Sequence, residues 1–262
     1  IKVPAWLNAP IYYHNRGNSQ FSGENSLYGD FVGLDDLFTE HPKVVQGMID
    51  IYTGWISDFD IDGFRIDTVK HVNADFWRQF SDAILAHAKE NGKEEFFIFG
   101  EVFSGNDQLL SYYTTDSDMS AVLDFRMQGS VRDYVSQGNS AANLQTFFEA
   151  DDIFIDEDSN AYSLPTFIGN HDMGRFGYFL VADNINDNGG ALSDDELLAR
   201  TRLAHALLYF SRGVPVVYYG DEQGFAGDGG DQDARQDMFP SQVASYNDDD
   251  LIGTTATTAS DN

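Results

Sequence analysis

The sequence contains no cysteine among its 262 residues. This absence excludes disulfides, catalysis by a thiol and metal centres with cysteine ligands. Long apolar runs are also missing, since no stretch approaches the roughly 18 consecutive residues that a membrane-spanning helix needs. The first residues, Ile1-Lys2-Val3-Pro4, lack the charged and then apolar pattern of a secretion leader. We therefore expect no membrane partner, and we expect any signal peptide to lie upstream of this sequence.

Basic residues are scarce, because Lys and Arg total 15 against 43 Asp and Glu, which gives a formal net charge of −28. Such a chain repels polyanions, so we expect no nucleic-acid partner. The acidic excess fits adaptation to salt, where screening relieves repulsion between carboxylates, and it equally fits an ordinary acidic secreted enzyme. With 42% hydrophobic residues, the chain can bury a core for one or two domains.

Apolar patterns predict strands that alternate with helices. Residues 42–55 and 76–84 have helical periodicity, and Ser193 with Glu196 forms a capping box that opens a helix ending at Gly213. Strands are expected at 63–69, 96–102, 121–125, 164–170 and 214–219. This alternation indicates an α/β fold with a parallel sheet. Residues 1–37 show no sustained period and read as a loop region or small subdomain.

The decapeptide Asp62 to His71 combines a strand pattern with two acids and an arginine. Asp67 lies near the C-terminal end of this strand, where a parallel barrel carries its chemistry. Arg65 lies two residues earlier and so on the same face, where its guanidinium can hold the Asp67 carboxylate ionised and oriented. Asp67 is therefore a candidate nucleophile. An ordinary surface ion pair at a strand end is the alternative.

Two further acids follow predicted strands. Glu101 comes 34 positions after Asp67, and Asp172 comes 71 positions after Glu101. A barrel devotes roughly 31 residues to each strand and helix, so these spacings correspond to one and two repeats and place the three acids on one rim. Converging carboxylates suit glycoside hydrolysis, where one acid protonates the leaving oxygen while another attacks or activates water. His171 is either a structural residue or, as its place at the rim favours, a donor to substrate hydroxyls.

The motifs together resemble those of the alpha-amylase family, glycoside hydrolase family 13, and the resemblance runs through essentially the whole chain. They are Asp62-Gly63-Phe64-Arg65-Ile66-Asp67 with Lys70-His71, then Gly100-Glu101-Val102, then Asn170-His171-Asp172. The resemblance implies a (β/α)8 TIM barrel. It also implies that Asp67 is the nucleophile, that Glu101 is the general acid/base and that Asp172 is the third acid, which stabilises the transition state.

Other roles come from the same resemblance. Arg65 and His171 are expected to contact the sugar at the cleavage point, and Lys70 and His71 are expected to line the leaving-group side. The carbonyl of His71 is expected to bind a structural calcium ion. Asp30 precedes a segment that resembles a short family motif, Leu34-Asp35-Asp36-Leu37. It is a second candidate calcium ligand, although an aspartate in a turn explains it equally well.

The resemblance also implies a mechanism and a substrate. Glu101 gives its proton to the glycosidic oxygen while Asp67 attacks the anomeric carbon, and water then opens the intermediate with retention of the α configuration. For this chemistry the carboxyl groups of Asp67 and Glu101 should lie about 5–5.5 Å apart. We expect a secreted (extracellular or periplasmic), monomeric enzyme that cleaves internal α-1,4 bonds of starch-like α-glucans and maltooligosaccharides. A cyclodextrin glucanotransferase, a neopullulanase-type hydrolase and a non-catalytic glucan-binding relative are the alternatives.

The sequence also predicts an incomplete barrel. Only 66 residues precede Asp67, whereas three strand and helix repeats of roughly 30 residues each should do so. We therefore expect residues 1–37 to be the C-terminal part of an inserted domain B. Residues 38–262 are then a partial barrel that runs from helix 3 to strand 8 and the following loop. Five strands leave sheet edges and apolar faces exposed, so we expect the chain by itself to aggregate or to be inert unless another piece completes it.

Overall fold

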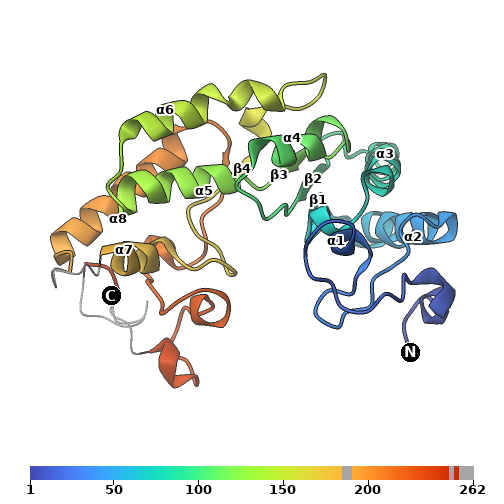
Figure 1. The fold of residues 1–262 in the computed structure, drawn as a ribbon, viewed down its shortest axis with the longest axis horizontal. Helices are drawn as coiled ribbons and strands as arrows, with labels where there is room; N and C mark the ends of the chain where they lie inside the picture. The colour runs from blue at the N-terminus through green and yellow to red at the C-terminus, as the bar shows by residue number, and fades with distance from the viewer. Residues whose placement is uncertain (185–190, 248–250, 254–262) are drawn as a thin grey trace. The chain divides into compact units, whose positions relative to one another are not determined.

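The computed structural model describes residues 1–184, 191–247 and 251–253. In chain order the α-helices are α1 (Asn25–Tyr28), α2 (Pro42–Phe59), α3 (Ala74–Glu90), α4 (Asp107–Thr115), α5 (Phe125–Val131), α6 (Ala141–Glu149), α7 (Phe176–Asn184) and α8 (Asp194–Phe210). The strands are β1 (Gly63–Ile66), β2 (Phe97–Gly100), β3 (Ala121–Val122), β4 (Pro165–Thr166) and β5 (Val214–Pro215). Figure 1 labels the helices and strands β1 to β4 in the same way.

The chain forms two compact units. The first unit comprises Ile1–Ser104, Gln108–Leu123 and Phe154–Ser159. The second unit comprises Gly105–Asp107, Asp124–Ile153 and the described residues of Asn160–Asn262. In both units the strands pair in parallel, which confirms the predicted α/β class.

A parallel sheet in the order β1-β2-β3 forms the centre of the first unit. Strand β1 pairs with β2 in a register that runs from Gly63↔Phe97 to Ile66↔Gly100. Strand β2 lies between its two neighbours, and its Ile98 is completely buried. Phe97 and Phe99, on the other face of β2, are half-buried. Apolar cover on both faces, complete on one of them, explains why residues 96–99 are continuously apolar.

Helices α2 and α3 pack against each other in the first unit. Pro42 occupies the first turn of α2, where its missing N–H leaves no bond unmade. Asn73 caps α3 by accepting a hydrogen bond from the Phe76 N–H at 2.8 Å. The apolar face of α3 is buried and includes Phe80 and Ile84. Both predicted amphipathic helices are therefore confirmed.

In the second unit, β4 and β5 pair in parallel, and Asp124 forms a parallel bridge with Thr166 of β4. Helices α5, α7 and α8 share an apolar core that contains Met127, Leu180 and Leu208. Helix α8 opens with the predicted capping box, in which Ser193 accepts from the Glu196 backbone and Glu196 accepts from the Ser193 backbone.

Several predicted strands are shorter than expected. The prediction of a strand through Val69 is wrong, because Thr68 adopts a left-handed conformation (φ +53°) and Val69 begins a 3₁₀ turn. The prediction of a strand through Phe125 is also wrong, because Asp124 caps helix α5, which begins at Phe125. In both places the strand stops where a polar contact redirects the backbone. Residues 1–37 contain α1, 3₁₀ turns and isolated bridges, in agreement with the expected irregular region.

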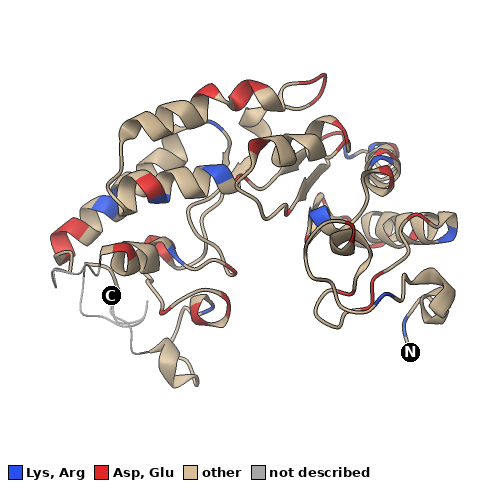
Figure 2. Cartoon of the chain, in the orientation of Figure 1, with Lys and Arg blue, Asp and Glu red and all other residues tan. Residues whose placement is uncertain are grey.

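Acidic side chains dominate the surface charge of both units. Figure 2 shows Asp and Glu on many helices and loops, with few Lys and Arg between them. Within the described ranges, no helix combines the length and the apolar character needed to cross a membrane.

We predict that Ile98→Ala lowers the free energy of unfolding by about 2–5 kcal/mol, because it empties a fully buried position in the central strand. Leu34→Ala is the matched control. Leu34 is 71% exposed, so its loss should change stability by less than about 0.5 kcal/mol. Urea unfolding followed by circular dichroism measures both, and equal effects of the two substitutions would contradict the assignment of the core.

Candidate functional site

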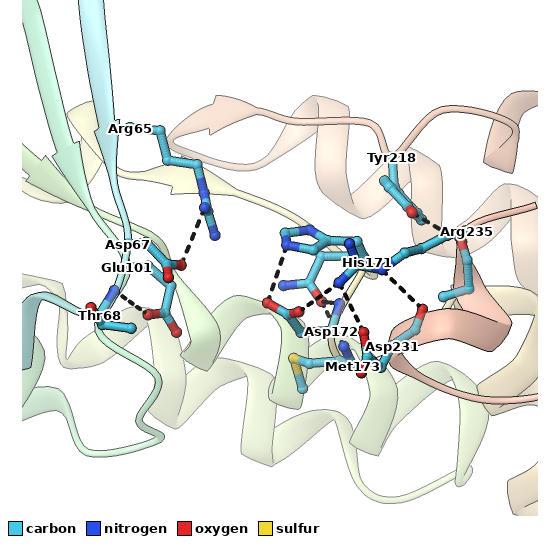
Figure 3. A network of polar contacts seen from close by, with 12 residues as sticks. Arg65, Asp67, Thr68, Glu101, His171, Asp172, Met173, Tyr218, Asp231 and Arg235 are labelled. Atoms are coloured by element: carbon cyan, nitrogen blue, oxygen red, sulfur yellow. Dashed lines mark hydrogen bonds and ion pairs between the residues drawn. The ribbon is translucent and has the colours of Figure 1, made fainter. Parts of the chain in front are cut away.

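The register of β1 and β2 brings Asp67 and Glu101 together in the first unit (Figure 3). The last register pair is Ile66↔Gly100, and each acid is the next residue along its strand direction. The Glu101 N–H donates to the Ile66 carbonyl at 2.7 Å, which continues the ladder by one step. Because neighbouring strands lie about 4.8 Å apart, the two acids emerge from adjacent positions at the carboxyl ends of the strands.

Glu101 is the buried member of this pair, with 7% of its surface exposed. Burial raises the pKa of Glu101 because it penalises the charged form, and the negative charge of Asp67 raises this pKa further. The Thr68 N–H opposes both effects, since it donates to Glu101 Oε2 at 3.0 Å. The positive charges of Arg65 and Lys70 also lower the pKa, and the net direction is upward. A carboxyl group in this environment is suited to hold a proton.

Thr68 is a site residue that the sequence analysis missed. Its positive φ is unfavourable for a β-branched side chain. The strained turn directs the backbone N–H of Thr68 at Glu101, and the Val69 N–H donates to the Glu101 carbonyl at 3.0 Å. Strain of this kind is concentrated at functional sites, where surrounding contacts hold it in place.

Asp67 is the accessible member of the pair, with 64% of its side chain exposed. Arg65 Nη1 lies 3.4 Å from Asp67 Oδ1, as shown in Figure 3. Because water screens an ion pair this exposed, it adds little stability, and its effect is to orient the carboxylate. Asp67 therefore presents an oriented oxygen that a substrate can reach.

Lys70 and His71 follow Asp67 in the 3₁₀ turn Val69–His71. Lys70 donates to the Phe103 carbonyl at 2.8 Å. The ring of His71 lies edge-on to Phe21 and Phe31, and its Nδ1 is 3.0 Å from the Ser26 carbonyl. Burial lowers the pKa of His71, which favours the neutral imidazole.

Asp172 and His171 belong to the second unit, so the convergence of all three acids stays a prediction. Asn170 shapes their turn, because its Oδ1 accepts from the Asp172 N–H at 3.0 Å and from the Met173 N–H at 2.8 Å. His171 Nε2 lies 3.3 Å from Asp172 Oδ2. The side chain of Asp172 is 41% exposed, and a substrate can therefore reach it.

Arg235 is a second residue that sequence reasoning missed. Its Nη2 lies 3.4 Å from Asp172 Oδ1 and 2.9 Å from Asp231 Oδ1 (Figure 3). The loop that carries Arg235 is anchored on both sides, because the hydroxyl of Tyr218 donates to the Ala234 carbonyl at 2.9 Å and that of Tyr219 donates to the Gln236 carbonyl at 2.7 Å. Arg235 and Asp172 are 63 positions apart, and no motif in the sequence indicates that they are in contact.

Arg175 supports the turn that bears Asp172. It is completely buried, and its Nη1 donates to the Tyr219 carbonyl at 2.6 Å and to Asp221 Oδ1 at 2.9 Å. Its Nε donates to Gln236 Oε1 at 2.7 Å, and its guanidinium group lies over the ring of Tyr218. One side chain thus links the segment after β4 to the segment after β5 and to the loop next to Arg235.

Asp124, the acid that caps α5, has a structural role. Its side chain is 1% exposed and pairs with Arg212, which also binds Asp151 at 2.6 Å. The same carboxylate accepts from the Met127 N–H at 2.8 Å and so caps α5. All its contacts are therefore internal to the second unit.

The residues expected to bind calcium do not form a site through their side chains. Within the described part of the chain, no three or more His, Asp or Glu side chains are grouped so that they can hold a metal ion. Asp30 Oδ1 already accepts from the Asp36 N–H at 3.0 Å. The imidazole of His71 contacts Ser26, so only the backbone carbonyl of His71 is left as the expected calcium ligand.

Comparison with known proteins places this architecture in one family. The family model described as "Alpha amylase, catalytic domain" matches residues 8–255. The chain is 52% identical over 259 residues to an alpha-amylase of Streptomyces lividans, which covers 99% of this chain and 28% of that protein. It is 31% identical to a cyclomaltodextrin glucanotransferase of Thermoanaerobacterium thermosulfurigenes, over 90% of this chain and 30% of that protein.

The crystal structure of an Anoxybacillus alpha-amylase superposes with a TM-score of 0.74 at 29% identity, and the match covers 88% of this chain and 48% of that one. The strands and helices described above are thus part of a (β/α)8 barrel of the glycoside hydrolase class. The chain belongs to the alpha-amylase catalytic-domain family. It spans between a quarter and a third of the length of these curated relatives.

We predict that Asp67→Asn lowers the pKa of Glu101, because the substitution removes a like charge, and that Arg65→Gln raises it, because the substitution removes an opposite one. Carboxyl ¹³C chemical shifts recorded against pH measure both. Since the pKa of Glu101 is raised in the folded state, its ionisation destabilises the fold in full above that raised pKa. This cost decreases as the pH falls below the raised pKa and is gone below the ordinary pKa of a glutamate. A Glu101 titration that neither substitution moves would contradict the pairing.

Proposed function

We propose that the enzyme containing this chain hydrolyses internal α-1,4 bonds of starch-like α-glucans with retention of configuration. The observation that carries the proposal is the pair at the ends of β1 and β2, where a buried Glu101 with a raised pKa lies next to an exposed Asp67. Retaining glycosidases need one carboxyl group that is protonated and one that is ionised and close to it. The family membership supports the same reaction.

In the first step, Asp67 is the nucleophile and Glu101 is the general acid. The Asp67 carboxylate attacks the anomeric carbon while the Glu101 carboxyl group protonates the departing glycosidic oxygen. A glycosyl ester on Asp67 results, and the leaving glucan departs with a free hydroxyl group. The raised pKa keeps Glu101 protonated at a pH where an ordinary glutamate is already ionised.

In the second step, Glu101 is the general base. It takes a proton from water, the water oxygen bonds to the anomeric carbon, and the ester to Asp67 breaks. Two inversions give net retention. The Thr68 N–H favours the ionised form of Glu101 that this step requires, while burial favours the protonated form that the first step requires.

We assign supporting roles to the other motif residues. Asp172 stabilises the positive charge that develops on the sugar, and Arg235 and His171 hold its carboxylate in place. His171 donates to a substrate hydroxyl, Arg65 orients Asp67, and Lys70 and His71 line the leaving-group side. Because a glucan polymer cannot cross a membrane unaided, we also propose that the enzyme acts outside the cytoplasm, as a monomer.

A glucanotransferase is the second candidate function. The cyclomaltodextrin glucanotransferase of Thermoanaerobacterium thermosulfurigenes, which matches 90% of this chain at 31% identity, supports it. In that reaction a sugar hydroxyl replaces water in the second step, and the roles of Asp67 and Glu101 do not change. The products separate the two functions, because hydrolysis releases linear reducing sugars and transfer releases cyclic ones.

We predict that Glu101→Gln lowers kcat on maltoheptaose by about 10²–10⁴-fold, because a general acid typically contributes that much. Glu95→Gln, at an exposed acid before β2, is the matched control and should leave the rate unchanged. Proton NMR follows the reaction and should show the α-anomer released first. An unchanged rate in Glu101→Gln, or first release of the β-anomer, would refute the assignment.

We also propose a structural calcium ion held by the His71 carbonyl and Asp30, on the strength of the family resemblance. If this is right, removing calcium with a chelator should lower the melting temperature, and Asp30→Asn should reduce that effect. Asp35→Asn, at a neighbouring exposed acid, is the control. A melting temperature that is the same with chelator and with added calcium would contradict the proposed structural calcium ion.

A further inference from the structure

Helices α5 and α6 border an open pocket that the proposed reaction does not use. The two helices pack against each other in the second unit (Figure 1), and the pocket has a volume of about 420 Å³. This volume falls within the range of small-molecule sites. Arg126 and Gly129 line it from α5, Asn143 and Thr146 line it from α6, and Asp133 lines it from the segment between them.

Gly129 keeps the pocket open on the side of α5. A Cβ atom added at this position would meet no atom within 4 Å apart from its neighbours in the helix, and the residue does not adopt a positive φ. Glycine destabilises a helix relative to most other residues. The helix therefore lacks a stabilising side chain at a position where one would fit. The result is a stretch of backbone that a ligand can approach closely.

Arg126 supplies accessible hydrogen-bond donors to this pocket. Its Nε donates to Asp107 Oδ1 at 2.7 Å, which fixes the plane of the guanidinium group. Within the described ranges, no residue accepts a hydrogen bond from Nη1 or Nη2 of Arg126. The side chain is 32% exposed, so a ligand in the pocket can reach these two nitrogens.

Asp133 and Asn143 supply acceptors. Asp133 Oδ1 accepts from the Asn139 side chain at 2.7 Å, and Asp133 Oδ2 accepts from Asn143 Nδ2 at 2.8 Å. Because the Asn143 nitrogen is committed to Asp133, its Oδ1 is left to accept from another group. Asp133 lies in the π-helical turn Arg132–Ser136, which continues α5. Turns of this kind often occur at functional sites.

The charges around the pocket narrow the choice of ligand. Asp107 already balances the guanidinium group of Arg126, whereas neutral amides hold Asp133. An anion would therefore meet an unbalanced carboxylate in a chain of net charge −28. A metal ion lacks ligands, since the described part of the chain has no group of three or more His, Asp or Glu side chains that could hold one. A neutral compound whose hydroxyl groups both donate and accept matches the donors and the acceptors together.

We propose that this pocket binds a neutral sugar. Oxygens of the sugar accept from Arg126 Nη1 and Nη2, and its hydroxyl groups donate to Asn143 Oδ1 and to the Asp133 carboxylate. The sugar lies over the backbone at Gly129, where no side chain is in the way. The site shares no residue with the Asp67 and Glu101 pair, and it does not depend on the proposed hydrolysis.

Titration of the full chain with maltose, followed by ¹H–¹⁵N NMR, tests the proposal. We expect saturable shifts of the Ser130 amide and of the Arg126 side chain. Gly129→Met places a side chain in the open space and should weaken binding at Ser130 by at least about tenfold. The melting temperature should not fall, because methionine is a better helix former than glycine. Gly54→Met, at a glycine of α2 that also has no atom within 4 Å, is the matched control and should leave the shifts unchanged.

A second variant tests the donors without filling the pocket. Arg126→Lys keeps a positive charge beside Asp107 but removes the paired Nη donors, so it should weaken binding at Ser130 by at least about fivefold. Arg78→Lys, at an exposed arginine of α3, is its control. The Thr68 amide reports on the candidate active site, and its own response to maltose should be the same in Gly129→Met and in Arg126→Lys.

Three results would overturn the proposal. The first is the absence of a saturable shift at Ser130 and Arg126, which would mean that water alone fills the pocket. The second is a stronger response to sodium acetate or glycine than to maltose, which would indicate a site for a charged ligand. The third is an affinity at Ser130 that neither variant changes, or one that falls equally at Thr68, which would mean that the shifts do not report sugar in this pocket.

Discussion

The parallel register between β1 and β2 is the constraint on which the rest of the site depends. It ends at Ile66 and Gly100, so the next residue on each strand is an acid, and backbone hydrogen bonds rather than side-chain contacts set the distance between the two acids. Once that distance is set, burial raises the pKa of Glu101, while Asp67 stays exposed to a substrate. Shifting the register by one residue would turn one acid to the opposite face of the sheet.

In the second unit, contacts of a buried side chain take the place of a long strand in holding the turn of the third acid. The turn that bears Asp172 has no long strand behind it, since β4 comprises only Pro165–Thr166. Arg175 compensates, because its buried guanidinium group links this turn to the segment that follows β5. In the first unit sheet hydrogen bonds position the two acids, whereas in the second unit Arg175, which lies over the rings of Tyr218 and Tyr219, holds together the segments around Asp172.

Sequence patterns were sufficient for the fold class, for helices α2, α3 and α8 and for the placement of Asp67 and Glu101 near the C-terminal ends of two adjacent strands, because apolar periodicity and capping residues act locally. They were not sufficient for Thr68, whose role depends on a strained backbone angle, or for Arg235, which reaches Asp172 across a long loop. Strand ends were predicted too late because hydrogen bonds override the apolar pattern: at Thr68 a tertiary bond to Glu101, and at Asp124 a local cap on the Met127 N–H. Proposed roles at the candidate site therefore rest on contacts that only the folded chain displays.

The most direct test of the central claim is to identify the residue that becomes covalently attached to sugar. A fluorinated maltosyl fluoride, which slows both steps and provides a good leaving group, should trap the intermediate in the enzyme that contains this chain. Peptide mass spectrometry should then locate one maltosyl group on Asp67, and none when Asp67 is replaced by Asn. A label on Glu101 or Asp172 instead, or the absence of any covalent adduct while the fluoride is hydrolysed, would contradict the account.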